Sequence, residues 1–392
     1  MKRVRIAYLL GGIATDLGGT EKQLLRTIEG LDRKQFEPSV VLLNETPWTR
    51  ANQLPCPSFA LGHRGFLDAG FPAVVQRLRR YVREQRIDVL QVFFEEPLFV
   101  AYLATLLYRG KPKMVASRRD LGLTQQPWYH HLFQIARPHV LRRFSAVLVN
   151  GMAVKQHAMA QDGVPEERIR VIHNGIQLPV PATESPPLFR ESAADIWIAV
   201  VANLNPVKRH DIFLQALEKL KAECAGWNVR AILLGQGQEE ARLRRLAANL
   251  GVGERVHFVG AVSNVGAYLQ NVDIGVLCSD REGSSNAVME YMAFGLPVVV
   301  TAVGGNPELV DESNGFCIPS ADPDALCAAL AKLIRGPDLR CHMGIRSREK
   351  IERSFSWDRT LGELETFYLE LLRLSDVQAH ENENSLARKN HD

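Results

Sequence analysis

The stretch that indicates the fold of this chain is residues 282–290, which read Glu-Gly-Ser-Ser-Asn-Ala-Val-Met-Glu. The apolar run Ile274–Leu277 before it predicts a strand, and the segment Asn286–Phe294 predicts a helix. The small residues between them let backbone N–H groups face outward at the helix N-terminus, where the dipole favours an anion such as a diphosphate. Glu282 and Glu290 flank this turn as acceptors for hydroxyl groups. We predict an anion-binding turn, with a helix start and acidic capping as the alternative.

Short apolar strands alternate with helical segments on both sides of this stretch. The predicted strands are Val4–Leu10, Ser39–Leu43, Val89–Phe94, Met114–Ala116, Ala146–Val149, Ile196–Val201, Val229–Leu234, Val256–Val259, Ile274–Leu277 and Pro297–Val300. Such an alternation predicts parallel sheets covered by helices on both faces. The fold class is therefore α/β, with two doubly wound, Rossmann-like domains whose ligands bind beyond the carboxyl ends of the strands.

The domain boundaries follow from the breaks in this alternation. A length of 392 residues exceeds one ordinary core and fits two domains. The proline-rich stretch within 178–187 interrupts the pattern and predicts a linker. We expect a first domain at 1–180, a linker at 181–194, a second domain at 195–355, a helix at 356–375 that packs back toward the first domain, and a disordered polar tail at 376–392.

Cysteine usage and hydropathy indicate a cytoplasmic protein. None of the six cysteines forms a Cys-x-x-Cys pair or clusters with histidines, so we expect free thiols in a reducing compartment. The apolar start of the chain is interrupted by Gly11-Gly12, so we expect a buried strand there and not a signal peptide. The longest apolar run, Leu98–Tyr108, is too short to span a membrane.

Charge is distributed unevenly between the two halves. Residues 1–180 hold 25 Lys and Arg against 15 Asp and Glu, whereas residues 181–392 hold 22 against 29. A basic first half predicts a phosphorylated partner or an anionic membrane surface, and a solvated basic surface is the alternative. No nucleic-acid motif accompanies the charge, so we expect no nucleic-acid partner. The basic residues behind the membrane prediction are Lys111, Lys113, Arg118, Arg119, Arg142 and Arg143.

The second half resembles the donor domain of family 4 of the GT-B glycosyltransferases. The resemblance rests on ordered blocks at 196–211, 232–239, 256–260, 273–310 and 315–330. In the first half, residues 17–21 resemble the family's Gly-Gly-x-Glu loop, and residues 171–176 resemble its segment at the end of the first domain. The resemblance implies a GT-B architecture in which the two domains face a central cleft, the first binding an acceptor and the second a nucleotide sugar.

The resemblance also implies roles for individual residues. Glu282, Lys208 and Arg119 would be the catalytic residues, and Lys208 would contact the donor diphosphate. Many relatives carry an arginine where this chain has Asn203, so Arg209 is expected to substitute in part. The predicted donor-binding residues are Gly19, Asn203, Lys208, Arg209, Val259, Glu282, Gly283, Ser284, Ser285, Asn286 and Glu290.

The first half departs from the family at two histidines. Relatives often carry them after the strands at 88–93 and 114–120, where this chain has Gln91, Phe93 and Arg119. Arg118 or Arg119 would bind an acceptor phosphate or steady the leaving diphosphate, with Asp120 orienting the arginine. A surface ion pair is the alternative for these residues. The predicted acceptor-binding residues are Glu95, Arg118, Arg119 and Asp120.

These features together predict a retaining glycosyltransferase that uses a UDP- or GDP-sugar. The acceptor is expected to be a glycan or a lipid-linked molecule in cell-surface polysaccharide biosynthesis, with the enzyme at the inner membrane face. No cofactor and no metal are expected, since Asp322-Pro323-Asp324 is typical of a helix cap. The alternatives are a GT-B sugar-nucleotide epimerase and a non-catalytic nucleotide-sugar-binding subunit.

Overall fold

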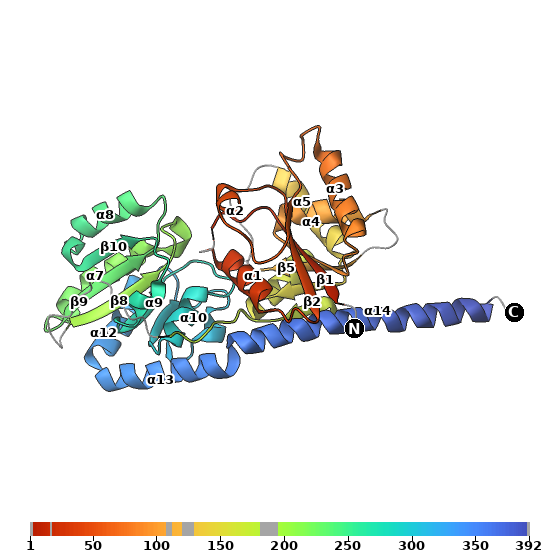
Figure 1. Ribbon diagram of the computed structural model, residues 1–392. Helices are drawn as coiled ribbons and strands as arrows, with labels where there is room; N and C mark the ends of the chain where they lie inside the picture. The colour runs from red at the N-terminus through yellow and green to blue at the C-terminus, as the bar shows by residue number, and fades with distance from the viewer. Residues whose placement is uncertain (1–2, 16–17, 107–111, 120–128, 181–194, 390–392) are drawn as a thin grey trace. The chain divides into compact units, whose positions relative to one another are not determined.

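The chain folds into two compact units. The computed structural model describes residues 3–15, 18–106, 112–119, 129–180 and 195–389, and it describes their side chains except at 129–132 and 374–389 (Figure 1). Unit 1 holds Met1–Asn150, Val154–Ile172 and Thr360–Asp392, and unit 2 holds Gly151–Ala153 and His173–Arg359. Each unit is built on one parallel sheet with helices on both faces, which confirms the predicted fold class.

Unit 1 has a seven-stranded parallel sheet in the order β3-β2-β1-β4-β5-β6-β7. Its strands are β1 Val4–Leu10, β2 Phe36–Leu42, β3 Ser58–Ala60, β4 Val89–Phe93, β5 Lys113–Arg118, β6 Ala146–Val149 and β7 Ile169–Val171. The register places Tyr8 of β1 opposite Gln91 of β4, and Gln91 opposite Val115 of β5. These three side chains therefore share one face of the sheet.

Helices cover both faces of this sheet. They are α1 Gly19–Gly30, α2 Pro47–Ala51, α3 Phe71–Glu84, α4 Glu95–Thr105, α5 Tyr129–Leu141, α6 Met152–Asp162 and α14 Trp357–Lys389. On one face α3, α4, α5 and α6 bury the first core, and Val74, Leu78 and Val82 form the apolar stripe of α3 that the sequence predicts. On the other face α1 and α14, the blue helix of Figure 1, bury the second core.

Unit 2 has a six-stranded parallel sheet in the order β10-β9-β8-β11-β12-β13. Its strands are β8 Asp195–Val201, β9 Asn228–Leu234, β10 Val256–Gly260, β11 Ile274–Leu277, β12 Val298–Thr301 and β13 Gly315–Ile318. Its helices are α7 His210–Glu223, α8 Glu240–Asn249, α9 Val265–Leu269, α10 Asn286–Ala293, α11 Asn306–Leu309, α12 Pro323–Arg335 and α13 Pro337–Ser354. Helices α7, α8 and α12 line one core, and α9 and α10 line the other.

Two expected segment boundaries differ from those observed. Residues 173–180 belong to unit 2 and not to the first domain, because the Ile176 amide donates to the Phe355 carbonyl and the Trp357 amide donates back to Ile176. The tail is not irregular, since α14 continues to Lys389 through residues that contain neither proline nor glycine. The predicted linker at 181–194 lies outside the described residues. In the part of the chain that the structure describes, no helix is long and apolar enough to cross a membrane.

Candidate functional site

Two loops meet at the carboxyl end of the sheet of unit 2. One loop follows β8 and the other follows β11. These two strands are neighbours in the sheet, and the strand order reverses between them. Ligands of open parallel sheets bind at such a switch point, beyond the carboxyl ends of the strands. The first loop ends in the 3-10 turn Pro206–Lys208, and the second carries Glu282. The sheet topology therefore brings the two predicted catalytic residues of unit 2 to one place.

Lys208 and Glu282 form an ion pair there. Lys208 Nζ lies 2.5 Å from Glu282 Oε1, and the Ser279 hydroxyl donates to the same oxygen at 2.5 Å. The Glu282 side chain is only 9% exposed, whereas the Lys208 side chain is 24% exposed. A carboxylate held by two donors in a mostly buried position is well oriented, and the ammonium keeps access to solvent. Lys208 is thus a cation that an incoming anion can reach.

A glycine turn after β12 holds the Glu282 loop in place. Gly304 has a φ of 55°, and a Cβ atom on it would lie 1.7 Å from the Glu282 carbonyl oxygen. The Gly305 amide donates to the Gly283 carbonyl at 2.8 Å. Glycine is required at 304 both by the left-handed backbone and by the close approach. The predicted turn at 282–285 is therefore packed directly against a second loop of the same sheet edge.

Helix α10 begins immediately after this turn. Ser285 is its N-cap, and its hydroxyl accepts a hydrogen bond from the Val288 amide at 3.3 Å. Asn286 Oδ1 accepts a hydrogen bond from Asn174 Nδ2 at 2.9 Å. Glu290 is half-buried about one turn further along the helix. The sequence prediction of a strand, turn and helix N-terminus at this position is correct, and Ser284 lies in the turn.

On its buried side α10 is fixed by Tyr291. The Val201 amide at the end of β8 donates to the Tyr291 hydroxyl at 2.5 Å, and this hydroxyl donates to the Val276 carbonyl at 3.2 Å. The ring packs so closely that a Cβ atom on Gly275 would lie 2.3 Å from it. Burial raises the pKa of Tyr291, which keeps the hydroxyl neutral and available as a donor. Helix α10 is therefore tied to the two central strands.

Glu308 of α11 organises the segments that the sequence singled out at 171–176. Its carboxylate accepts hydrogen bonds from the Met152 amide at 2.8 Å, the Ala153 amide at 3.2 Å and His173 Nε2 at 3.1 Å. Burial raises the pKa of Glu308, but these hydrogen bonds outweigh it and the pKa is lowered overall. The segment at 173–174 is therefore bonded to α11 and, through Asn174, to the start of α10.

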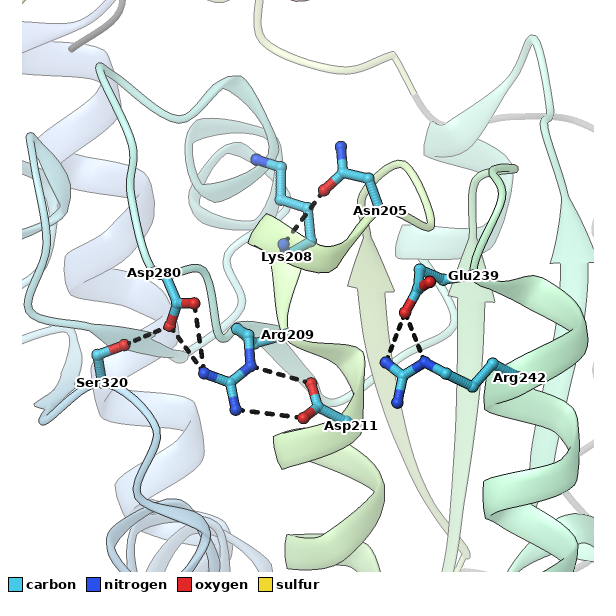
Figure 2. A network of polar contacts seen from close by, with 8 residues as sticks. All are labelled: Asn205, Lys208, Arg209, Asp211, Glu239, Arg242, Asp280 and Ser320. Carbon is cyan, nitrogen blue, oxygen red and sulfur yellow. Dashed lines mark hydrogen bonds and ion pairs between the residues drawn. The ribbon is translucent and has the colours of Figure 1, made fainter. Parts of the chain in front are cut away.

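The Arg209 guanidinium donates hydrogen bonds to two carboxylates, those of Asp211 and Asp280 (Figure 2). Its Nε and Nη2 donate to the two oxygens of Asp211 at 3.1 and 3.2 Å, and its Nη1 donates to Asp280 Oδ1 at 3.1 Å. The hydrogen bonds to Asp211 raise the pKa of Arg209 most. Figure 2 shows the Lys208 side chain extending away from this network. The structure thus gives Arg209 a role in holding the loop together, where the sequence predicted a donor contact.

His210 is buried beside Lys208 at the start of α7. Its side chain is 2% exposed, and neither ring nitrogen has a hydrogen-bond partner among the described residues. Burial and, to a smaller extent, the positive charge of Lys208 lower the pKa of His210 to about 4. A neutral imidazole is therefore enclosed next to the exposed ammonium.

The remaining predicted donor residues of unit 2 lie on the same sheet edge. Asn203 is exposed in the loop after β8. Val259 occupies a register shift in β10, where Phe258 pairs with Leu233 and Gly260 pairs with Leu234. A residue in such a shift presents its backbone away from the regular ladder, which suits a contact with a planar base.

In unit 1, two predicted acceptor residues belong to a buried charge cluster. Arg137 of α5 pairs with Glu95, and its Nη1 lies 2.9 Å from Asp162 Oδ1. Arg118 Nη2 lies 3.3 Å from Asp162 Oδ2. Asp162 is 2% exposed, its two partners Arg118 and Arg137 are 15% and 12% exposed, and Glu95 is 16% exposed. Glu95 and Arg118 are therefore paired inside unit 1 in a buried cluster, and their contact with an acceptor stays a prediction.

Arg119 directly follows Arg118, the last residue of β5. Its guanidinium lies 5.4 Å from the centre of the Phe93 ring, and its carbonyl accepts from Asn150 Nδ2 at 3.5 Å. Burial lowers the pKa of Arg119 to about 10. Asp120, predicted to orient this arginine, lies outside the described residues. Gly19 is the first residue of α1, next to the described end of the Gly-Gly-x-Glu loop.

Two family profiles match the chain. The profile described as "Glycosyl transferases group 1" matches residues 188–350, and "Glycosyltransferase Family 4" matches residues 17–178. The N-acetyl-alpha-D-glucosaminyl L-malate synthase of Bacillus anthracis is 26% identical over 312 residues, covering 77% of this chain and 79% of that protein.

The chain is a glycosyltransferase. It resembles the group 1 and family 4 enzymes along both halves. The Vi polysaccharide biosynthesis protein VipC/TviE of Salmonella typhi is 26% identical over 283 residues, covering 66% of this chain and 47% of that protein. The Anabaena protein HepE, solved in complex with UDP, superposes with a TM-score of 0.78 over 94% of this chain and 100% of that one at 20% identity, and this likeness shows the GT-B fold.

Sequence analysis of the glycosyltransferase missed several residues that build the site. Ser279, Tyr291 and Glu308 hold Glu282, α10 and the segment at 173–174 in place, and the partners of Tyr291 and Glu308 are distant in sequence. Gly304 carried a signal, because two adjacent glycines follow a predicted strand. None of the other three stands out by residue type or spacing, so only the tertiary contacts identify them.

The glycosyltransferase uses Asp322 as a helix cap. The Asp322 carboxylate accepts from the Ala325 amide at 2.8 Å at the start of α12, which confirms the prediction for the Asp-Pro-Asp sequence. Among the residues that the structure describes, no three His, Cys, Asp or Glu side chains are grouped so as to hold a metal ion.

Proposed function

We propose that this glycosyltransferase moves a sugar from a UDP- or GDP-sugar to a glycan or lipid-linked acceptor, with retention of anomeric configuration. The observation that carries the proposal is the Lys208–Glu282 pair at the switch point of unit 2, beside the N-terminus of α10. A mobile ammonium and a helix N-terminus are suited to a diphosphate, and an oriented carboxylate is suited to sugar hydroxyls.

The donor would exchange partners with this ion pair. The donor diphosphate pairs with the Lys208 ammonium in place of Glu282. The Glu282 carboxylate, still held by Ser279, then accepts a hydrogen bond from a hydroxyl of the sugar. Glu290 would accept from the ribose hydroxyls, and the backbone near Val259 would meet the base. Charge develops on the diphosphate as it leaves, so a cation placed there stabilises the transition state more than the ground state.

Retention fits a front-face reaction. The acceptor hydroxyl attacks the anomeric carbon from the side on which the diphosphate leaves. The bond from the anomeric carbon to the diphosphate oxygen breaks, the glycosidic bond forms, and the hydroxyl proton passes to the leaving phosphate. This scheme needs no dedicated protein base, so Gln91 and Arg119 at the histidine positions of relatives are compatible with it. Lys208 and the α10 dipole would balance the diphosphate without a metal or other cofactor.

The acceptor and the pathway are proposed from the relatives. The Salmonella relative is named for Vi polysaccharide biosynthesis, and HepE has been solved with UDP and with UDP-glucose. These names support a nucleotide-sugar donor and a role in polysaccharide biosynthesis, and the cytoplasmic location and the cell-surface product are proposed from the sequence. Arg119 in unit 1 would meet an anionic group of the acceptor.

We further propose that unit 1 contacts an anionic membrane surface. Leu67 is 88% exposed and Ile135 is 78% exposed. The ring centres of Phe66 and Phe133 are 4.7 Å apart, so the segments that carry Leu67 and Ile135 lie close together. Arg142, directly after α5, is exposed as well. Exposed apolar side chains beside basic ones are suited to the headgroup region of an anionic bilayer.

Vesicle sedimentation tests this membrane contact. Binding to vesicles rich in anionic lipid should fall for Leu67→Asp and for Arg142→Glu. The matched control is Ile345→Asp, which changes an exposed isoleucine of unit 2 and should bind like the wild type. Equal binding by all four proteins, or binding only to neutral vesicles, would refute the contact.

A donor panel without metal tests the transferase site. Wild type, Lys208→Ala and Glu290→Ala are titrated with UDP-, GDP- and other nucleotide sugars while slow donor hydrolysis is followed. Lys208→Ala should lower kcat/KM by roughly 100-fold, the usual effect of removing one transition-state donor. Lys219→Ala is the control, because Lys219 pairs with Asp324 on the surface of the same unit. If donors bind to the wild type but none is hydrolysed, the non-catalytic nucleotide-sugar-binding alternative replaces this proposal, and if no donor binds, both are refuted.

A further inference from the structure

A polar network crosses the apolar core between the unit 1 sheet and α14. The Tyr368 hydroxyl of α14 donates to Gln91 Oε1 at 2.5 Å, and Gln91 Nε2 donates to the Ser117 hydroxyl at 2.7 Å. The Tyr8 hydroxyl lies 3.2 Å from the Tyr368 hydroxyl. Ser117 is 7% exposed and the other three are at most 1% exposed. Residues from β1, β4, β5 and α14 are thus joined inside a core that is otherwise apolar.

This network specifies how α14 docks. A buried amide or hydroxyl without a partner costs about 1–3 kcal/mol, so Gln91 needs the Tyr368 hydroxyl. Each residue turns an α-helix by about 100°, so a shift of α14 by one residue would remove that hydroxyl from Gln91. Apolar side chains of similar size would fill the same space without this requirement. The network therefore stabilises one position of α14 on the sheet, whereas apolar packing alone would also allow neighbouring positions of the helix.

The network ends beside Arg119. Ser117 is two residues before it on β5, and Phe93, whose ring Arg119 covers at 5.4 Å, lies two residues after Gln91 on β4. The rings of Phe93 and Tyr8 are 6.4 Å apart.

We propose that Tyr368 is a positioning residue for Arg119. Helix α14, which carries Tyr368, thereby fixes the position of the cation that meets the acceptor. The inference rests on the proposed function, in which Arg119 meets an anionic group of the acceptor. Tyr368 itself touches neither substrate. It fixes the ends of β4 and β5 and, through Tyr8, the Phe93 ring over which the Arg119 guanidinium lies.

Replacement of Tyr368 by phenylalanine tests the inference. Tyr368→Phe should raise the KM for an anionic acceptor, or lower kcat for transfer, by about tenfold, whereas donor binding and donor hydrolysis stay within twofold of wild type. The matched control is Thr105→Val, which removes a buried hydroxyl from the other core of unit 1, where it donates to the Ala101 carbonyl at 2.9 Å. Thr105→Val should retain wild-type transfer kinetics at a comparable loss of stability.

A double-mutant cycle separates positioning from a general structural effect. If Tyr368 acts through Arg119, Tyr368→Phe should have no further effect on transfer in an Arg119→Ala background. Additive effects, or wild-type transfer by Arg119→Ala, would overturn the inference. Donor hydrolysis by the wild type distinguishes the two proposals. If it is absent, the proposed function fails, and if it is present while Tyr368→Phe transfers normally, only the positioning role fails.

Discussion

Acidification should destabilise unit 2 through His210. The His210 ring is buried at the start of α7, and burial lowers its pKa to about 4, whereas an ordinary histidine has a pKa of 6.5. Between these values the unfolded chain binds a proton that the folded chain does not, so stability falls as the pH drops from 6.5 toward 4 and is fully present above 6.5. At about 1.4 kcal/mol per pKa unit, the loss between pH 7.5 and pH 4.5 is about 2.5 kcal/mol.

The assay is urea unfolding of wild type and His210→Leu at both pH values, followed by tryptophan fluorescence. The wild type should lose about 2.5 kcal/mol more than His210→Leu on acidification, because leucine has no proton to bind. His342→Leu, which replaces an exposed histidine of α13 in the same unit, is the control and should keep the wild-type difference. Parallel pH dependence of wild type and His210→Leu would refute the argument that burial holds this ring neutral.

Three further substitutions test the packing described above. Gly304→Ala should weaken donor binding at least tenfold by titration, because its Cβ atom would displace the Glu282 carbonyl, and an unchanged Kd would show that the turn can move freely. Asp162→Asn should cost about 3–5 kcal/mol in urea unfolding, since it leaves the buried Arg137 partly unpaired, and a loss below about 1 kcal/mol would contradict a buried pair. Asp322→Ala should cost about 1 kcal/mol through loss of the α12 cap, and no shift of the unfolding midpoint would argue against that cap.

The long strands and the helix starts were predictable from the sequence. Runs such as Ile6–Leu10 in β1 and Ile196–Val201 in β8 are apolar because strands in a covered parallel sheet are buried on both faces. The edge strands β3, β7 and β13 have only three or four residues, so they show no such pattern and form only when a neighbouring strand supplies hydrogen bonds. The boundary near 172 also depended on contacts between distant segments.

The residues of the candidate site also divide into those that the sequence predicts and those that only the tertiary structure identifies. The sequence by itself determined the turn and helix at 282–290, because strand, glycine and capping signals are local, and the resemblance to family 4 enzymes indicated the lysine at 208. Only the tertiary structure decided which charges meet. Lys208 and Glu282 are 74 residues apart and pair because β8 and β11 are neighbours, whereas Glu95 and Arg118 are joined to Arg137 and Asp162 from α5 and α6. Charge pairing depends on distance in space, and sequence spacing carries no information about it beyond a few residues along one helix or strand.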